Sequence, residues 1–275
     1  FSVFYIYPFL KVFQLSVCDW NGIDEFSFSA FYTGLTNFRE ILVDKIWWQA
    51  MWHAAYITLI ALTFQNLLAL LLAVACDREL KARNYFRVIF FLPPILSEVV
   101  VGLIWQWIYD GHYGLLNHAL QALGWSQLVH SWLSDPKTAL TCIAVVHSWK
   151  GFGWGFIILL AGLQTIPRQL YEAAKVDGAS SWYIFKHVAV PMMIPVFVLV
   201  SILSILGSML VFVLIYTMSG GGDGYHTEVP VTRILASMTA SSRFGYACAQ
   251  GILFGLVLLI VSFTQKKLSE RLKQE

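Results

Sequence analysis

The stretch Ala54–Ala75, AAYITLIALTFQNLLALLLAVA, is mainly apolar and contains no charged residue. A helix crosses the hydrocarbon core of a bilayer with about 20 such residues. Backbone amides cannot stay unpaired in lipid, so an apolar run that spans the membrane must be helical or part of a closed barrel. Barrel strands alternate in character over about ten residues, which this stretch does not do. It predicts a transmembrane helix.

Five other stretches have the same character. The whole set is roughly Phe1–Val17, Ala54–Ala75, Tyr85–Ile108, Ala139–Gln164, Val190–Thr217 and Ala247–Thr264. Of the 275 residues, 58% are hydrophobic and 12% are charged, against about 25% charged residues in soluble domains. The sequence therefore predicts an all-α integral membrane protein with six transmembrane helices. Phe1–Val17 lacks the cleavage pattern of a signal peptide, so we interpret it as a truncated first helix.

Lysine and arginine are unevenly distributed between the segments that separate these stretches. Cytoplasmic loops of membrane proteins are enriched in both residues. One alternating set of segments holds Arg78, Lys81, Arg83, Arg87, Arg168, Lys175, Lys186, Lys266, Lys267, Arg271 and Lys273. The other set holds Arg39, Lys45, Lys137, Arg233 and Arg243. The bias predicts both chain termini in the cytoplasm.

The remaining segments give no sign of a second domain or of a catalytic centre. Three long outer segments, Cys18–Met51, Asp110–Thr138 and Met218–Tyr246, contain turn signals such as the glycine run Gly220–Gly224. No internal repeat or nucleotide-binding motif stands out, so residues 1–275 are interpreted as a single domain. The cysteines lie far apart and the histidines show no HExxH spacing, so neither a metal site nor a catalytic residue is predicted.

The segment 165–190, on the predicted cytoplasmic side, still reads as helix. Pro167 suits the first turn of a helix, and Asp177-Gly178 predicts its end, with glycine in the left-handed conformation of a C-terminal cap. Ser180 or Ser181 can cap a second short helix, and Pro191 is expected to open the next span. The pattern predicts two helices joined by a glycine turn, lying across the inner membrane surface.

This segment also offers a surface to a partner. Ala173 and Ala174 leave one side of the first helix without bulk, so another backbone can approach closely. Leu170, Tyr171 and Phe185 supply apolar anchors beside it. The alternative is that the acidic residues merely solvate an inner loop.

The spacing of these residues resembles a known motif. Glu172-Ala173-Ala174, then three residues, Gly178, nine residues and Val188-Ala189-Val190-Pro191 is similar to the EAA loop of binding-protein-dependent ABC permeases. The family pattern ends in Ile-x-Leu-Pro, so both valines are mild departures; Asp177 before the glycine also fits.

Other segments resemble the carbohydrate-importer branch of that family, of the MalF and UgpA type. They are Ala161–Pro167, Gly34-Leu-Thr-Asn37-Phe38, Phe91-Leu92-Pro93 and Phe244-Gly245-Tyr246-Ala247. The branch usually has proline after its outer glycine run, where this chain has Asp223. This departure bears on the shape of the loop and not on the resemblance to the family.

The resemblance implies a type I ABC importer permease fold and a non-catalytic transport subunit in a bacterial or archaeal cytoplasmic membrane. It implies a heterodimer with a second homologous permease. It also implies two copies of an ABC ATPase, which bind ATP and Mg, so that this chain itself needs no cofactor. An extracytoplasmic solute-binding protein is the third implied partner, with Gly220–Gly224 and Trp125–Trp132 as its contact regions. Lipid and a sugar are further partners; nucleic acid is not. The implied ATPase-coupling residues are Leu170, Tyr171, Glu172, Ala173, Ala174, Asp177, Gly178 and Phe185.

Four residues within the apolar stretches are candidates for a substrate path, because ionisable groups in the bilayer are costly. Lys150 lies mid-span, with His147 and Trp154 at helical spacing on one face. Glu98 is expected in the middle of the third span, just after a kink at Pro93-Pro94. Together they suit a sugar, which stacks on an indole and hydrogen-bonds through its hydroxyls. Alternatively, Lys150 and Glu98 form a pair that only holds the bundle together.

Several further alternatives stay open at this stage. Lys150 also allows an anionic solute, such as an acidic oligosaccharide or a glycerol phosphodiester. Gly151, Gly153 and Gly155 permit either close helix approach or a local break. Serines 201, 204 and 208 are interpreted as helix-packing residues. Two other classes are a secondary transporter and an integral-membrane enzyme, but neither would account for the EAA-like loop.

Overall fold

The computed structural model describes residues 2–77, 83–221 and 223–272. All regular secondary structure in those ranges is helical, apart from an isolated bridge between Cys18 and Tyr32. The prediction of an all-α chain is confirmed. Five residues used in predicting spans, orientation and loop contacts lie outside the described residues: Phe1, Arg78, Lys81, Gly222 and Lys273.

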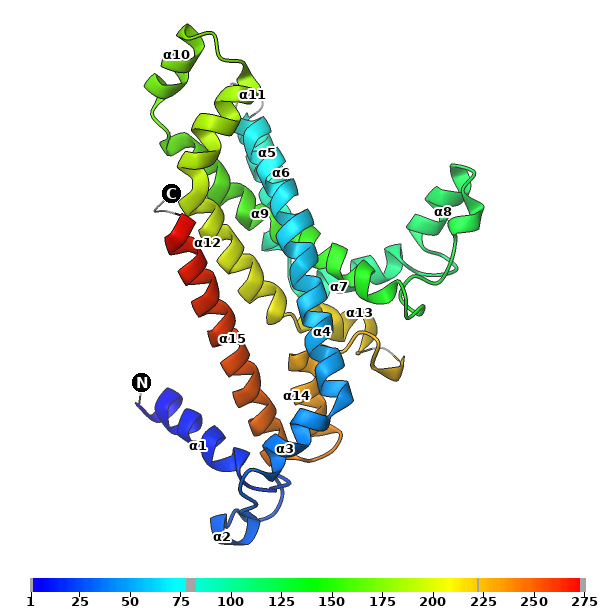
Figure 1. The fold of residues 1–275 in the computed structure, drawn as a ribbon. Helices are drawn as coiled ribbons and strands as arrows, with labels where there is room; N and C mark the ends of the chain where they lie inside the picture. The colour runs from blue at the N-terminus through cyan, green and yellow to red at the C-terminus, as the bar shows by residue number, and fades with distance from the viewer. Residues whose placement is uncertain (1, 78–82, 222, 273–275) are drawn as a thin grey trace.

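Within the described ranges, four helices are long and apolar enough to cross a membrane. The first runs from Lys45 to Asp77 through α4 (Lys45–Ile60), the π-helical turn η2 (Ala61–Gln65) and α5 (Asn66–Asp77). The others are α9 (Ala139–Thr165), the helix Ser181–Met209, and α15 (Phe244–Leu272). Figure 1 shows α4, α12 (Val190–Met209) and α15 running side by side along the molecule.

The third predicted span is broken rather than continuous. It consists of α6 (Arg83–Ile95) and α7 (Glu98–Ile108), which are bent by 95° at the two residues between them. Pro93 and Pro94 lie inside α6, and each removes a backbone donor and crowds the preceding turn. The sequence predicted a kink at this proline pair with Glu98 just after it. Glu98 is the first residue of α7, so it lies at the break, near the middle of residues 85–108.

The fifth predicted span is wrong at both ends. Its helix begins at Ser181 and continues through α11 (Ser181–Ile184) and the π-helical turn η4 (Phe185–Ala189) into α12. Pro191 lies in the first turn of α12, as predicted, but the helix already runs continuously into it from Ser181. The wider π turn just before it accommodates the missing amide hydrogen. At the other end α12 stops at Met209, and a separate helix, α13 (Val213–Ser219), follows.

The first stretch forms a shorter helix. η1 (Ser2–Ile6) leads into α1 (Tyr7–Ser16), which packs on α15. This described part is shorter than the ~20 residues of a full crossing. The described chain thus holds four spans, or five when α6 and α7 count as one.

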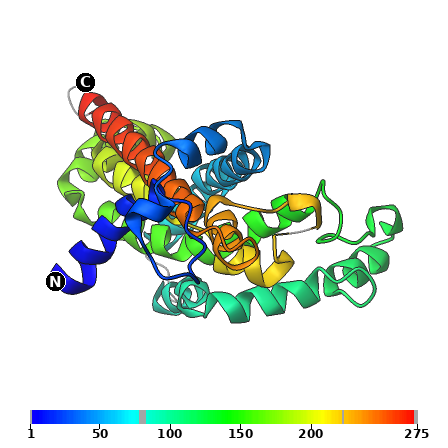
Figure 2. The same cartoon turned by 90° about the horizontal axis from the view of Figure 1, so that it is seen from below.

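Shorter helices flank or connect the long ones. They are α2 (Phe28–Phe31), α3 (Thr36–Val43), α8 (Leu115–Ala122), η3 (Ser126–Leu128), η5 (Asp223–Tyr225) and α14 (Pro230–Thr239). Figure 2 shows α7 and α8 extending sideways, away from the long helices. The chain between α7 and α9 is therefore an arm on the side of the bundle.

Three alternate glycines on α9 allow its neighbours to approach. A Cβ at Gly153 would lie 2.5 Å from the Phe90 carbonyl oxygen, and one at Gly151 would lie 2.6 Å from the Gln65 side chain. A Cβ at Gly155 would meet Ala69 and Val200 at 3.2–3.3 Å. Since α9 is continuous, these glycines serve close helix approach and not a local break.

Candidate functional site

A cavity of about 370 Å³ lies between α7, α9, α12 and η2. We call it the inner cavity. Its lining includes all four residues predicted for the substrate path: Glu98, His147, Lys150 and Trp154. Three come from one face of α9, as the sequence spacing indicated, and the fourth is brought there by the break before α7. The proximity is a structural observation; the transport role of these residues remains a prediction.

The charged pair of the inner cavity is close but not tightly closed. Lys150 Nζ lies 3.8 Å from Glu98 Oε1, and the two side chains are 15% and 43% exposed. That separation is too long for a hydrogen bond, although the charges attract each other. The two charges compensate, so the cavity has no net charge from this pair, and both groups keep hydrogen-bonding capacity for a solute.

The indole of Trp154 offers the inner cavity an apolar plate. The side chain is more than half exposed in the isolated chain. Phe91 supports it edge-on, with ring centroids 5.1 Å apart. An apolar flat face beside polar groups is the combination that small-molecule sites use for orientation and contact.

Gln65 is a lining residue that the sequence analysis missed. It is buried at the end of the π-helical turn η2, and its Oε1 atom has no hydrogen-bond partner among the described residues. Its Nε2 donates to Ser204 Oγ at 3.3 Å. Buried polar groups are normally paired, and π turns often mark functional sites. The adjacent amides Gln65 and Asn66 inside an apolar run were the available signal.

The serines of α12 connect it to the first long helix. Ser204 Oγ donates to Asn66 Oδ1 at 2.8 Å, and Ser208 Oγ donates to Thr58 Oγ1 at 2.9 Å. These interhelical bonds are of the kind expected for packing in a membrane. Ser204 also lines the inner cavity.

The segment 165–190 forms the glycine turn that its sequence predicted. α10 (Arg168–Val176) ends before Gly178, whose φ of +79° is left-handed. The Gly178 amide donates to the Lys175 carbonyl at 3.0 Å, and the Ala179 amide donates to the Ala174 carbonyl at 2.9 Å. This is the paired bonding of a Schellman motif. Ser180 then caps α11 by accepting from the Tyr183 amide.

The surface of this segment is more apolar than its sequence indicated. None of the α10 residues is buried, so Leu170, Glu172 and Ala173 face outward. Val176 and Trp182 are 87% and 70% exposed; neither was predicted as an anchor. Large apolar side chains gathered on a protruding segment mark a contact surface. We call residues 168–183 the coupling surface.

Two of the predicted anchors have a different environment. Tyr171 and Phe185 are partly buried and pack on the core formed by α5, α9 and α12. Burial raises the pKa of the Tyr171 hydroxyl, which keeps it neutral. Both side chains therefore attach the coupling surface to the helical bundle of this chain.

The coupling surface and the inner cavity are parts of one helical connection. α11, η4 and α12 form a continuous helix from Ser181 to Met209. Its first turn belongs to the coupling surface at one end of the molecule (Figure 1). Farther along, Val200, Leu203 and Ser204 line the inner cavity. The exposed segment and the cavity wall are therefore joined by a helix without an intervening loop.

These features define the class of a multi-pass membrane protein with a polar cavity in its helical bundle and an exposed apolar surface at one end. The chain belongs to the family described as "Binding-protein-dependent transport system inner membrane component", which matches residues 65–274.

Two relatives illustrate the likeness. The probable ABC transporter permease protein YurN of Bacillus subtilis is 32% identical over 99% of this chain and 94% of its own length. The trehalose/maltose transport system permease protein MalF of Thermococcus litoralis is 31% identical over 95% of this chain and 86% of its own.

A solved structure shares the fold. A chain from the crystal structure of a bacterial alginate ABC transporter in complex with an alginate pentasaccharide-bound periplasmic protein has a TM-score of 0.84. The match covers 99% of this chain and 91% of the solved chain, and the two sequences are 22% identical. The agreement shows that the two chains share a fold.

Proposed function

We propose that this chain is the permease subunit of an ATP-driven ABC importer for a sugar or oligosaccharide that a solute-binding protein delivers. The observation that carries the proposal is the inner cavity, whose charge-compensated pair and exposed indole lie on helices joined directly to the coupling surface. Relatives named for trehalose/maltose and for arabinooligosaccharides support the solute class.

The proposed assembly has further parts. Two copies of an ABC ATPase bind ATP and Mg, and this chain takes no catalytic part. A second homologous permease completes a heterodimer, and the solute-binding protein docks on the outer side. The chain is a single permease domain of type I fold with six transmembrane helices, both termini in the cytoplasm, and it lies in the inner membrane. Family membership and the apolar helices support this arrangement.

In the proposed mechanism, closure of the ATPases moves the coupling surface. Glu172, Ala173 and the turn at Gly178 dock on the ATPase. The continuous helix Ser181–Met209 then tilts as one body and changes the access of the inner cavity. A two-state equilibrium responds only to contacts that differ between its states, and α12 provides such contacts because it borders the cavity.

A neutral solute is favoured over an anionic one. Glu98 already compensates the charge of Lys150, so an added carboxylate or phosphate would meet one cation and one anion. An acidic oligosaccharide remains the second candidate, because the alginate-importer fold is shared and displacement of Glu98 would free the lysine.

The experiment is uptake by the reconstituted importer with its ATPases and binding protein. Radiolabelled maltotriose and trigalacturonate serve as neutral and acidic probes of equal length. We expect ATP-dependent uptake of maltotriose, and a higher half-saturating concentration in the Trp154→Ala variant. Lys150→Ala should affect both probes alike. Uptake without ATP would indicate a secondary transporter, and selective loss of trigalacturonate uptake in Lys150→Ala would establish the acidic solute.

A further inference from the structure

We propose that a second saccharide-binding site lies on the outer face of this chain, where a neutral sugar is held before it enters the inner cavity. This inference deepens the proposed function and rests on it. The site is a cavity of about 950 Å³, which is at the upper end of the range for small-molecule pockets. We call it the outer pocket.

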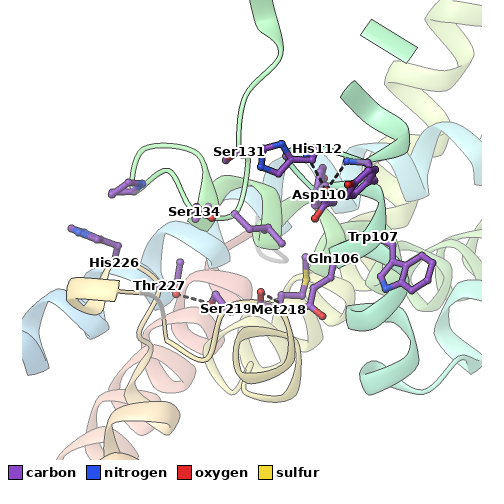
Figure 3. A pocket seen from close by; sticks show the side chains of 16 residues that line it. Gln106, Trp107, Asp110, His112, Ser131, Ser134, Met218, Ser219, His226 and Thr227 are labelled. Carbon is purple, nitrogen blue, oxygen red and sulfur yellow. Dashed lines mark hydrogen bonds between the residues drawn. The ribbon is translucent and has the colours of Figure 1, made fainter. Parts of the chain in front are cut away.

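Three segments that are far apart in sequence surround the outer pocket (Figure 3). The end of α7 contributes Gln106 and Asp110. The segment leading into α9 contributes Ser131 and Ser134, and the chain after α13 contributes His226. Figure 3 shows these labelled side chains arranged around one hollow.

Hydrogen bonds fix the walls of the outer pocket. Gln106 Nε2 donates to the Met218 carbonyl at 3.2 Å, which joins α7 to α13. The hydroxyls of Ser219 and Thr227 lie 2.7 Å apart and join the end of α13 to the chain that follows it. A site with preformed walls loses less entropy when it binds a ligand.

Other polar groups of the outer pocket remain available. Among the described residues, the side chains of Ser131, Ser134 and His226 have no hydrogen-bond partner within the chain. Hydroxyls and imidazoles both donate and accept, as the hydroxyl groups of a sugar do. A polar pocket with unused donors and acceptors therefore matches a saccharide better than an apolar ligand.

Aromatic rings and charge narrow the ligand class. Tyr113 and Trp107 are 86% and 82% exposed at the pocket, so their faces are available to the apolar face of a sugar ring. Asp110 is the single aspartate, glutamate, lysine or arginine among the described lining residues. Bonds from the His112 and Tyr113 amides lower the pKa of its carboxyl group, so it is ionised. Its negative charge disfavours an acidic sugar.

The outer pocket and the inner cavity share one helix. Glu98, the first residue of α7, lines the inner cavity, whereas Gln106, near its end, lines the outer pocket. Eight residues of helix separate them by about 12 Å. A solute that leaves the outer pocket can therefore move along α7 to the inner cavity when the helices change between outward-open and inward-open arrangements.

The test uses thiol protection in the complete reconstituted importer. Ser134→Cys places a thiol in the outer pocket, and Ser29→Cys, on the exposed helix α2 of another predicted outer segment, is the matched control. Both variants also contain Cys248→Ala, since the other native cysteines are buried. A membrane-impermeant maleimide is applied with and without maltotriose, trehalose, lactose and arabinotriose, and uptake of each sugar is measured in parallel.

We expect a sugar that the importer takes up to slow labelling of Ser134→Cys but not of Ser29→Cys. Adding Tyr113→Ala should raise the sugar concentration for half-maximal protection roughly two- to tenfold, as loss of one aromatic contact does. Uptake without protection at Ser134→Cys would overturn the outer pocket alone. Protection by the binding protein without sugar would show that a protein segment fills it. Uptake of none of the sugars would overturn the proposed function as well.

Discussion

The coupling surface and the inner cavity are built in opposite ways. The turn at Gly178 is closed by hydrogen bonds between residues at most five positions apart. The inner cavity joins Gln65, Glu98, Lys150 and Ser204, which lie on four separate elements. A local motif is specified by a short sequence, whereas the cavity exists only after the helices pack. The continuous helix Ser181–Met209 links the two regions. Because each region is built from its own residues, substitutions should nevertheless separate their functions.

The largest expected effect separates the two regions through a pair of tryptophans. Trp182→Ala removes an exposed anchor of the coupling surface and should weaken ATPase binding roughly 30-fold, the scale of a hot-spot residue. Trp154→Ala removes the plate of the inner cavity and should leave ATPase binding unchanged. Binding is measured by titrating the ATPase onto the permease pair in nanodiscs. Equal loss in both variants would show that the two regions are not separable.

A second substitution tests the turn itself. Gly178→Val forces a left-handed φ on a branched residue, at a cost of about 1–2 kcal/mol, although a Cβ there meets open space. We expect uptake to fall about tenfold while ATP hydrolysis by the assembled complex persists. Gly178→Asn is the control, because asparagine tolerates this conformation better. If valine and asparagine behave alike, the conformation of the turn is not what couples the subunits.

The third prediction concerns coupling between distant residues in the inner cavity. Lys150→Met and Glu98→Gln each leave one partner of the pair without compensation. Each should destabilise the permease by about 1 kcal/mol, less than for a fully buried pair, because Glu98 is partly exposed. The double variant should be less destabilised than the sum of the singles. Thermal unfolding in detergent measures this cycle, and simple additivity would show that the pair does not interact.

The smallest effect is expected at an exposed contact between distant segments. Arg243 donates to both carboxylate oxygens of Glu40, at 2.5 and 2.6 Å, and this hydrogen bonding lowers the pKa of Glu40. A lowered carboxyl pKa adds stability above its ordinary value of 4.5, and this stability is lost as the pH falls through the lower folded value.

Both side chains are more than a third exposed, so the pair should contribute only about 0.5–1 kcal/mol. The melting temperatures of the wild type and Arg243→Met should therefore differ at pH 7 and converge near pH 3. Arg39→Met, at a neighbouring arginine of α3, is the control. A difference that is independent of pH would show that the contact acts through packing.

Sequence reasoning was strongest where structure is local. It predicted the helical class, the turn at Gly178 and the cap at Ser180. It also placed His147, Lys150 and Trp154 on one helix face, which follows from helical periodicity alone. It placed Pro191 in the first turn of a helix, as α12 has it, but it did not foresee the π turn that joins this helix to the one before it. It missed Gln65, whose unpaired oxygen is evident only when α9 lies against it.

The sequence alone determined that this chain is a helical membrane protein of the permease family, because apolar length, charge bias and a local motif are all written in consecutive residues. Only the tertiary structure decided that the third span breaks by 95°, that Glu98 reaches Lys150, and that the coupling surface continues into the cavity wall. Those properties depend on packing between segments that are distant in sequence. The free-energy cost of a proline inside a helix, or of a buried amide, depends on the residues that pack against it.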